Sequence, residues 1–325
     1  MIISRTPLRI SFVGGGSDIQ TYYNYKSGAV VSTAIDKYIY ITVNKKFDDK
    51  IRASYSKTEI VDKISELNHE LIRECLKIVG IKGGIEITSI SDIPSEGTGL
   101  GSSSSYVVGL LNALYAYIGK YVNAERLARE ACGIEIDILK KPIGKQDQYI
   151  AAYGGLQYIQ FNSYGVYVDP IICKNETKLE LEKRLLMFYT GLTRSANNIL
   201  AVQTKNLESS EGKRKLMEKM VDLAKKTRKT LSRNSIDSFG ELLHQNWILK
   251  KEMAQGVSSH EIDNWYKKAI NAGATGGKIL GAGGGGFLLF YAPTEKHKNI
   301  IKALSNLKPY TCRFEPQGSK IIFVN

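Results

Sequence analysis

Residues 94–105 read P-S-E-G-T-G-L-G-S-S-S-S and lead directly into the apolar segment Tyr106–Ile118, whose spacing predicts a helix. Glycines let a backbone approach a ligand closely, because no Cβ stands in the way. The serines stand where the helix begins, so free backbone N–H groups and the positive end of the helix dipole face the loop. This combination predicts a site for a polyphosphate. The strand-like residues Gly84–Ile90 before the loop argue against the alternative, a flexible serine-rich linker.

The loop matches neither of two common phosphate-binding motifs. No Gly-Lys-Ser/Thr closes it, as a Walker A motif would require, and it is not the dinucleotide pattern G-x-G-x-x-G with an acidic residue further on. Two other glycine clusters frame it, R-T-P-L-R-I-S-F-V-G-G-G-S-D at Arg5–Asp18 and G-G-K-I-L-G-A-G-G-G-G-F at Gly276–Phe287. Either cluster alone is typical of a hairpin turn, so their combination carries the argument.

All three clusters, in this order and spacing, resemble the GHMP small-molecule kinase superfamily, which includes galactokinase, homoserine kinase, mevalonate kinase and phosphomevalonate kinase. The resemblance covers essentially the whole chain. The opening T-P-L-R-I-S-F-V-G-G-G-S-D and the stretch Y-T-G-L-T-R-S-A-N-N-I-L, Tyr189–Leu200, look like the heptose-phosphate kinase branch. The resemblance implies ATP and Mg²⁺ as cofactors. It also implies phosphoryl transfer to the anomeric hydroxyl of a mannose-configured heptose 7-phosphate.

Two other functions stay open at this point. A kinase of an unphosphorylated hexose, such as fucose or galactose, would carry the same clusters. A catalytically silent sensor of sugar and ATP would share the fold, although the intact set Arg9, Glu135 and Asp147 disfavours it. The oligomeric state is open, with a homodimer among the alternatives.

The resemblance implies a mixed α/β fold of the two-layer α+β kind. We expect a ribosomal-protein-S5-like N-terminal domain over residues 1–170 and a ferredoxin-like C-terminal domain over residues 171–325. Hydrophobic spacing predicts a strand at Leu8–Phe12 and a helix at Glu59–Val79. It also predicts one helix from Asn123 to Lys140, ended by Pro142. The later order of strand, helices, glycine hairpin, helix and strand is typical of a ferredoxin-like domain.

Composition limits the class of protein. A chain of 325 residues with 43% hydrophobic content can bury a real core. No long apolar run predicts a membrane span, and the start of the chain does not resemble a signal peptide, so we expect a cytoplasmic protein. The formal charge of +13 raises nucleic-acid binding as a rival. Because the basic residues are spread out, we expect no nucleic-acid partner. The charge also suits anionic substrates such as ATP and a sugar phosphate.

The first group of site residues would hold the nucleotide and its metal. The predicted nucleotide-binding residues are Pro94, Gly97, Gly99, Leu100, Gly101, Ser102, Ser103 and Ser104. The resemblance to G-L-G-S-S implies that Ser103 also ligates Mg²⁺. Glu135 is the candidate carboxylate ligand, because it borders the apolar face of its helix and stands twelve residues before Asp147, as in the family. A surface glutamate is the alternative interpretation, with Glu130 as the substitute ligand.

The second group would carry the chemistry. Asp147 lies in G-K-Q-D-Q, and the resemblance implies that it accepts the proton of the attacking hydroxyl. On a short helix it shares one side with Ile150 and Ala151, so a basic partner is expected for an inward carboxylate. Arg9, at the position of the family's active-site arginine, is the expected partner. The alternative for Asp147 is a charge that only stabilises a helix N-terminus.

The third group would bind the acceptor. The resemblance implies contacts from Gly14, Gly15, Gly16, Ser17 and Asp18. A simple Ser-Asp turn is the alternative for the last two of these residues. Arg194 is the first candidate for binding a distal phosphate, because it lies just before a helix predicted from Ser195. Lys145, close to Asp147, is the second candidate.

Overall fold

The computed structural model describes residues 1–94, 97–193 and 196–325, and it contains two β-sheets. The larger sheet has eight strands in the order β12-β1-β2-β5-β3-β4, with β6 pairing β2 and β7 pairing β6. Its strands are β1 (Ile2–Val13), β2 (Gly28–Lys45), β3 (Ile51–Ser54), β4 (Thr58–Val61), β5 (Ile85–Ser91), β6 (Leu156–Asn162), β7 (Gly165–Pro170) and β12 (Lys320–Val324). The long β2 links both parts of this sheet, since it pairs with β5 through its C-terminal half and with β6 through its N-terminal half.

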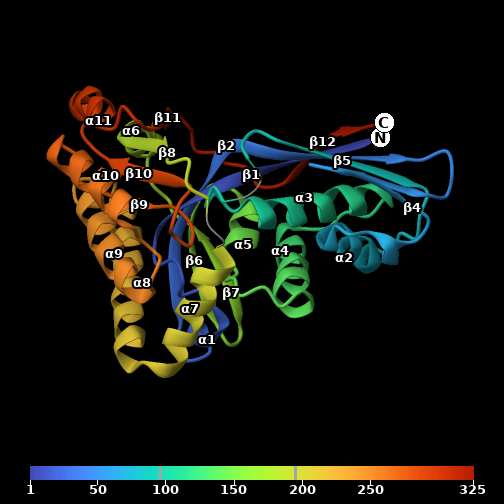
Figure 1. Ribbon diagram of the computed structural model, residues 1–325, viewed down its shortest axis with the longest axis horizontal. Helices are drawn as coiled ribbons and strands as arrows, with labels where there is room; N and C mark the ends of the chain where they lie inside the picture. Colours follow the sequence, from blue (N-terminus) through green and yellow to red (C-terminus); the bar gives the residue numbers. More distant parts are fainter. Residues whose placement is uncertain (95–96, 194–195) are drawn as a thin grey trace.

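One face of the larger sheet is covered by helices (Figure 1). These helices are α2 (Glu70–Val79), α3 (Ser102–Tyr117), α4 (Ala124–Cys132) and α5 (Gln146–Tyr153). Alternate residues of β1 and β2, such as Leu8, Ile10 and Ile41, are fully buried. Because side chains alternate across a strand, this pattern places the core between sheet and helices. Helix α3 is buried along most of its length, so it gives a rigid support to residues 97–101 before it, which we call the phosphate loop.

The smaller sheet has four strands in the order β11-β8-β10-β9. Its strands are β8 (Leu185–Tyr189), β9 (Gly276–Ile279), β10 (Phe287–Tyr291) and β11 (Lys308–Tyr310). The remaining helices are α1 (Gln20–Tyr23), α6 (Asn175–Lys183), α7 (Ala196–Ser209), α8 (Glu211–Ser232), α9 (Phe239–Met253), α10 (His260–Asn271) and α11 (His297–Ala303). The second core gathers around Trp247, Phe188 and Phe290, which are buried between this sheet and helices α9 and α10. The predicted ferredoxin-like order of strand, hairpin, helix and strand is therefore present.

The two ends of the chain meet in the larger sheet. Strand β12 pairs antiparallel with β1, and the amino group of Met1 donates to the carbonyl of Asn325 at 2.8 Å (Figure 1). The last strand thus joins the sheet of the N-terminal part, although the sequence pattern grouped it with the C-terminal one. The division at residue 170, which is the last residue of β7, stays a prediction.

One long helix predicted from the sequence is wrong in its first half. Residues 58–61 form β4, which pairs with β3, and helix α2 begins only at Glu70. The apolar residues Ile60 and Ile64 fit helical spacing, but tertiary pairing with β3 overrides that local preference. In the described part of the chain, no helix is both long enough and apolar enough to cross a membrane.

Candidate active site

The three glycine clusters line one cavity of about 640 Å³. Its wall includes Arg9 and Gly15 from the first cluster, Gly99 and Ser103 from the second, and Gly281 from the third. Helices α5 and α9 contribute Asp147 and Lys250. Segments that lie far apart in the sequence therefore converge on one cavity. Figure 1 shows the two sheets and the helices that carry these segments.

The phosphate loop has the backbone that the sequence predicted. Gly97, Gly99 and Gly101 all have positive φ, at 70°, 75° and 77°, a region that side chains disfavour. Helix α3 begins at Ser102 directly after Gly101, and Ser102, Ser103 and Ser104 line the cavity. Its first-turn N–H groups therefore lie at the cavity wall, where an anion could accept from them. By contrast, Leu100 is buried and Pro94 is exposed, and neither is among the residues that line the cavity.

The third glycine cluster packs directly on this loop. A Cβ added at Gly99 would lie 2.4 Å from the carbonyl oxygen of Leu280, and one at Gly281 would lie 2.7 Å from the Cα of Gly99. Gly286 approaches the carbonyl oxygen of Thr98 equally closely, at 2.4 Å from its added Cβ. Two backbones can approach this closely only where the residue that faces the other segment is a glycine. The turn that joins β9 to β10 thus packs against the backbone of the phosphate loop.

Glu135 is fully buried at one end of the cavity. Its carboxylate accepts from the hydroxyls of Ser103 at 2.6 Å and Ser104 at 2.7 Å, and from Nε2 of Gln148 at 2.7 Å. The ammonium of Lys141 stands 3.8 Å away. A buried carboxylate needs such partners, because its desolvation would otherwise be costly. Of the two acidic candidates, Glu135 is the one that meets the serines. Glu130 instead accepts from Tyr115 and Arg126 and is not among the lining residues.

A π-helical turn places Glu135 in the cavity wall. The predicted single helix is divided into α4 and a π-helical segment, Gly133–Ile138. A π-turn inserts one extra residue into a helix and rotates the following side chains, which is why such turns often mark functional sites. Regular spacing put Glu135 at the border of the buried face, whereas the observed turn buries it completely.

Arg9 and Asp147 form a two-pronged ion pair beside the phosphate loop. The Nε and Nη2 atoms of Arg9 donate to the two carboxylate oxygens of Asp147, each at 2.7 Å, and Nη1 donates to the carbonyl of Gly99 at 2.5 Å. Arg9 is only 4% exposed. A fork of this kind fixes the carboxylate in position as well as in charge. The structure therefore contains the Arg9–Asp147 pair that the sequence analysis expected.

Asp18 accepts hydrogen bonds from the first residue of α5. Its carboxylate accepts from the backbone N–H groups of Gly16 at 2.9 Å and Gln146 at 3.1 Å, and from the Gln146 side chain at 3.2 Å. Burial raises the pKa of Asp18, and the nearby charge of Asp147 raises it further. Gly144 makes this packing possible, because an added Cβ would lie 1.9 Å from a carboxylate oxygen of Asp18. The side chain still lines the cavity.

The other predicted acceptor residues have mixed positions. Gly15 and Gly16 line the cavity, whereas Ser17 is fully buried and exchanges hydrogen bonds with Ala29. Gly14 donates its N–H to Asn246 and is not among the lining residues. The ammonium of Lys145 lies over the ring of Tyr23, 4.7 Å from its centroid, and is likewise not in the lining. Arg194 lies outside the described residues.

Two buried lysines in the cavity wall were missed by the sequence analysis. Lys250 of α9 is 4% exposed and Lys278 of β9 is 2% exposed. Lys278 donates to the carbonyls of Ser11 at 2.8 Å and Phe12 at 3.1 Å. Burial lowers the pKa of both lysines, in the case of Lys250 to about 8. Neither belongs to a recognisable motif, apart from the place of Lys278 within the third glycine cluster.

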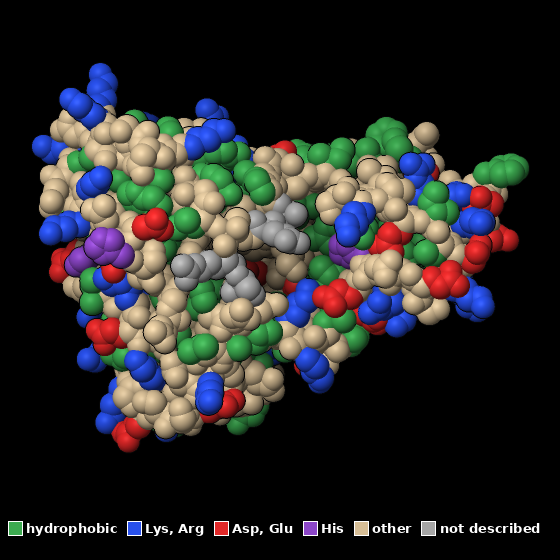
Figure 2. Space-filling model, in the orientation of Figure 1, with side chains coloured by type: hydrophobic (Ala, Val, Ile, Leu, Met, Phe, Trp, Pro, Cys, Tyr) green, Lys and Arg blue, Asp and Glu red, His purple; other side chains and the backbone are tan. Residues whose placement is uncertain are grey.

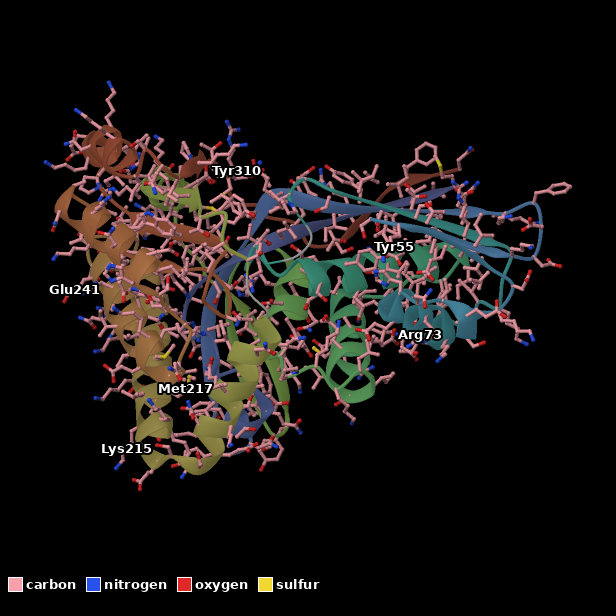
Figure 3. All side chains as sticks on the ribbon, in the orientation of Figure 1. Tyr55, Arg73, Lys215, Met217, Glu241 and Tyr310 are labelled. Atoms are coloured by element: carbon pink, nitrogen blue, oxygen red, sulfur yellow. The ribbon has the colours of Figure 1, made fainter. Side chains whose placement is uncertain are left out.

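Basic side chains elsewhere are distributed over the surface. Figure 2 shows Lys and Arg scattered over this face of the molecule and mixed with acidic residues. Lys215, at the outer side of α8 in Figure 3, pairs with Glu211 one turn away and is 68% exposed. An exposed pair of this kind is typical of a solvated helix face.

Comparisons with known proteins agree with this two-part fold. Residues 64–155 match the family model described as GHMP kinases N terminal domain, and residues 224–308 match the one described as GHMP kinases C terminal. The chain is 32% identical to D-glycero-alpha-D-manno-heptose 7-phosphate kinase of Campylobacter jejuni, with 96% of each chain covered. It is 27% identical to the bifunctional fucokinase/GDP-fucose pyrophosphorylase of Arabidopsis thaliana, over 92% of this chain and 30% of the relative. A solved structure of a D-glycero-D-manno-heptose 1-phosphate kinase from Bacteroides thetaiotaomicron superposes with a TM-score of 0.81 at 25% identity, with 100% of both chains covered.

Proposed function

The chain belongs to the GHMP kinase family of ATP-dependent phosphotransferases, and we propose that its acceptor is D-glycero-D-manno-heptose 7-phosphate. The γ-phosphate of ATP would pass to the anomeric hydroxyl and give the 1,7-bisphosphate. This product suits the synthesis of nucleotide-activated heptose and of surface polysaccharide. The similarity to a heptose 7-phosphate kinase along 96% of both chains supports this acceptor over a free hexose.

The observation that carries the proposal is the position of the Arg9–Asp147 pair. An added Cβ at Gly101 would lie 3.3 Å from Oδ2 of Asp147, so this carboxylate stands against the phosphate loop itself. A hydroxyl that hydrogen-bonds to Asp147 would therefore lie beside a phosphoryl group held by the loop. Phosphoryl transfer requires little more than this positioning together with neutralisation of charge.

Asp147 would accept the proton of the attacking hydroxyl. An ionised carboxylate has about four lone-pair sites, so two remain after the fork from Arg9. Arg9 would hold the carboxylate still and stabilise charge on the acceptor oxygen. The first-turn N–H groups of α3 at Ser102–Ser104 would bind the nucleotide phosphates from the other side.

Ser103 and Glu135 fit a magnesium ion. Mg²⁺ prefers oxygen ligands and is usually bound by one or two carboxylates together with phosphate oxygens and water. Here a hydroxyl and a carboxylate oxygen lie 2.6 Å apart in the cavity wall. The ion would neutralise charge on the transferred phosphoryl group. Lys141, which stands near Glu135, would add a second positive charge at this end of the cavity.

Replacing Glu135 by glutamine is expected to raise the Mg²⁺ concentration needed for half-maximal activity by about tenfold or more, because one of few anionic ligands is lost. A Mg²⁺ titration at saturating ATP and sugar measures it. Glu130→Gln is the matched control, since Glu130 binds Tyr115 and Arg126 instead. If Glu135→Gln titrates like the wild type while Glu130→Gln shifts, the ligand assignment passes to Glu130.

Acceptor choice can be tested directly. A panel of sugars and sugar phosphates with ATP, followed by phosphorus NMR of the product, identifies both the acceptor and the hydroxyl that reacts. We expect phosphate at the anomeric position of heptose 7-phosphate. Because charge-assisted contacts to a distal phosphate are worth about 1.5–3 kcal/mol each, free heptose should lose at least about tenfold in kcat/KM per contact. Equal efficiency on both sugars would favour the hexose-kinase alternative.

The distal phosphate anchor is proposed from the sequence. Arg194 stands in T-G-L-T-R, and Arg194→Ala is expected to remove much of the preference for phosphorylated sugar while leaving activity on free heptose nearly intact. The same two acceptors measure this effect. If wild type prefers the phosphate and Arg194→Ala keeps that preference, only the anchor assignment fails, and Lys145→Ala is the next variant.

A further inference from the structure

Lys250 reaches from α9 across to the first glycine cluster. Its ammonium donates to the carbonyl oxygen of Gly15 at 3.3 Å, and the residue lines the cavity although it is only 4% exposed. An ammonium can donate three hydrogen bonds. Among the described residues only Gly15 accepts one from Lys250. Within that part of the chain, this buried cation therefore has donors left for a molecule in the cavity.

The charged groups around Lys250 place it at the reacting end of the site. Asp18 and Asp147 both act on it as negative charges, and Arg9 acts as a positive one. Lys278, on neighbouring β9, is a second cation close to Lys250 in addition to Arg9. Unlike Lys278, which donates to two backbone carbonyls of β1, Lys250 makes one long hydrogen bond to a described residue. Lys250 thus lies near the Arg9–Asp147 pair without being part of it.

Two further polar atoms next to Gly15 lack partners. The hydroxyl of Ser11 and Oε1 of Gln146 are buried and have no hydrogen-bond partner among the described residues, and both residues line the cavity. An added Cβ at Gly15 would lie 3.3 Å from Oγ of Ser11 and 3.5 Å from Nε2 of Gln146. Buried polar atoms are normally paired, so unpaired ones in a cavity wall indicate a ligand that completes them.

We propose that Lys250, Ser11 and Gln146 form a subsite for the sugar hydroxyl adjacent to the reacting one. Lys250 donates to its oxygen, and its single hydrogen can be donated to Gln146 Oε1 or to Ser11 Oγ. A neutral hydroxyl is the group that suits this mixed set, because it both donates and accepts. The missing side chain of Gly15 leaves the space. The subsite deepens the proposed function and rests on it only in requiring a polyhydroxylated acceptor. It makes α9, in the C-terminal half, a determinant of acceptor specificity.

The test compares Lys250→Met with Lys251→Met. Lys251 is the next residue on α9, pairs with Asp263 outside the cavity, and serves as the matched control. With the best acceptor of the sugar panel, Lys250→Met is expected to raise KM for that acceptor about tenfold or more and to leave KM for ATP within about twofold. Lys251→Met should match the wild type in both constants.

A deoxy analogue separates binding from a structural effect. For the wild type, the acceptor without the hydroxyl next to the reacting carbon should lose about as much kcat/KM as Lys250→Met does on the full acceptor. For Lys250→Met the same deletion should cost clearly less than in the wild type, because the Lys250 interaction is already lost and only the contacts to Ser11 and Gln146 remain. Equal losses from the deletion in both proteins would overturn the subsite, since a merely structural lysine could not sense that hydroxyl.

The pH dependence gives an independent reading. With a pKa of about 8, Lys250 is charged below that pH and loses its proton above it. A donor role predicts that kcat/KM for the acceptor falls as pH rises through about 8, and that Lys250→Arg moves this limb to higher pH. A rise of kcat/KM through pH 8 that Lys250→Met abolishes would make Lys250 a base and overturn the proposal.

The two proposals fail separately. If heptose 7-phosphate is not phosphorylated but another sugar is, the proposed acceptor is wrong, and the Lys250 comparison proceeds on that sugar. If heptose 7-phosphate is the acceptor and Lys250→Met keeps the wild-type KM, only the subsite is wrong.

Discussion

Asp147→Asn is expected to lower kcat by about a hundredfold or more, the usual scale for the loss of a general base. In free energy this corresponds to about 2.7 kcal/mol of transition-state stabilisation. An asparagine can accept from only one prong of Arg9, because its NH₂ group replaces an oxygen that now accepts at 2.7 Å. KM for ATP should stay close to wild type, since the phosphate loop and α3 are untouched.

A loss of stability could imitate this result, so a second variant is needed. Asp169→Asn breaks the ion pair between Asp169 of β7 and Arg228 of α8, whose atoms are 3.2 Å apart, and Asp169 is not among the cavity residues. We expect Asp169→Asn to keep full kcat and Asp147→Asn to melt cooperatively and bind ATP. Near-normal turnover by a folded Asp147→Asn protein would contradict the base assignment and leave the carboxylate as the partner of Arg9 alone.

Local features of the sequence predicted which segments of the chain line the cavity. The three glycine clusters converge on one cavity because each encodes its own backbone: positive φ at Gly97, Gly99 and Gly101 is a property of those residues. A cation could be expected beside Asp147, since an inward carboxylate needs one, and the resemblance to the family pointed to Arg9. The strand predicted from spacing at Leu8–Phe12 likewise lies within β1.

Features that depend on long-range packing escaped prediction. The π-turn that buries Glu135 changes the helical phase by one residue, and no residue type marks it. Lys250 reads as an ordinary surface lysine, because its neighbour Lys251 is one and only the tertiary fold distinguishes them. The pairing of β12 with β1 joins residues more than 300 apart in sequence, which local pattern cannot reveal.

The contact between the hairpin and the phosphate loop leads to the second large effect. Gly281→Ala is expected to raise KM for ATP about tenfold or more. The new Cβ would lie 2.7 Å from the Cα and 3.0 Å from the carbonyl oxygen of Gly99, both backbone atoms that no rotamer change can move away. The loop must therefore shift, and its N–H groups would leave the positions from which we propose that they bind phosphate. A tenfold rise corresponds to about 1.4 kcal/mol of lost binding.

Gly281 also has a positive φ of 72°, so strain alone must be separated from the clash. Gly119 is the matched control: its φ is 71°, and an added Cβ meets nothing within 4 Å among the described residues. Both alanine variants should lose about 1–2 kcal/mol of stability from the left-handed backbone, measured by denaturant unfolding. Only Gly281→Ala should weaken ATP binding and so raise KM for ATP. Equal KM values for ATP in the two variants would show that the hairpin does not position the phosphate loop. A raised KM in Gly281→Ala alone would mean that nucleotide affinity depends on a backbone contact between the two halves of the chain.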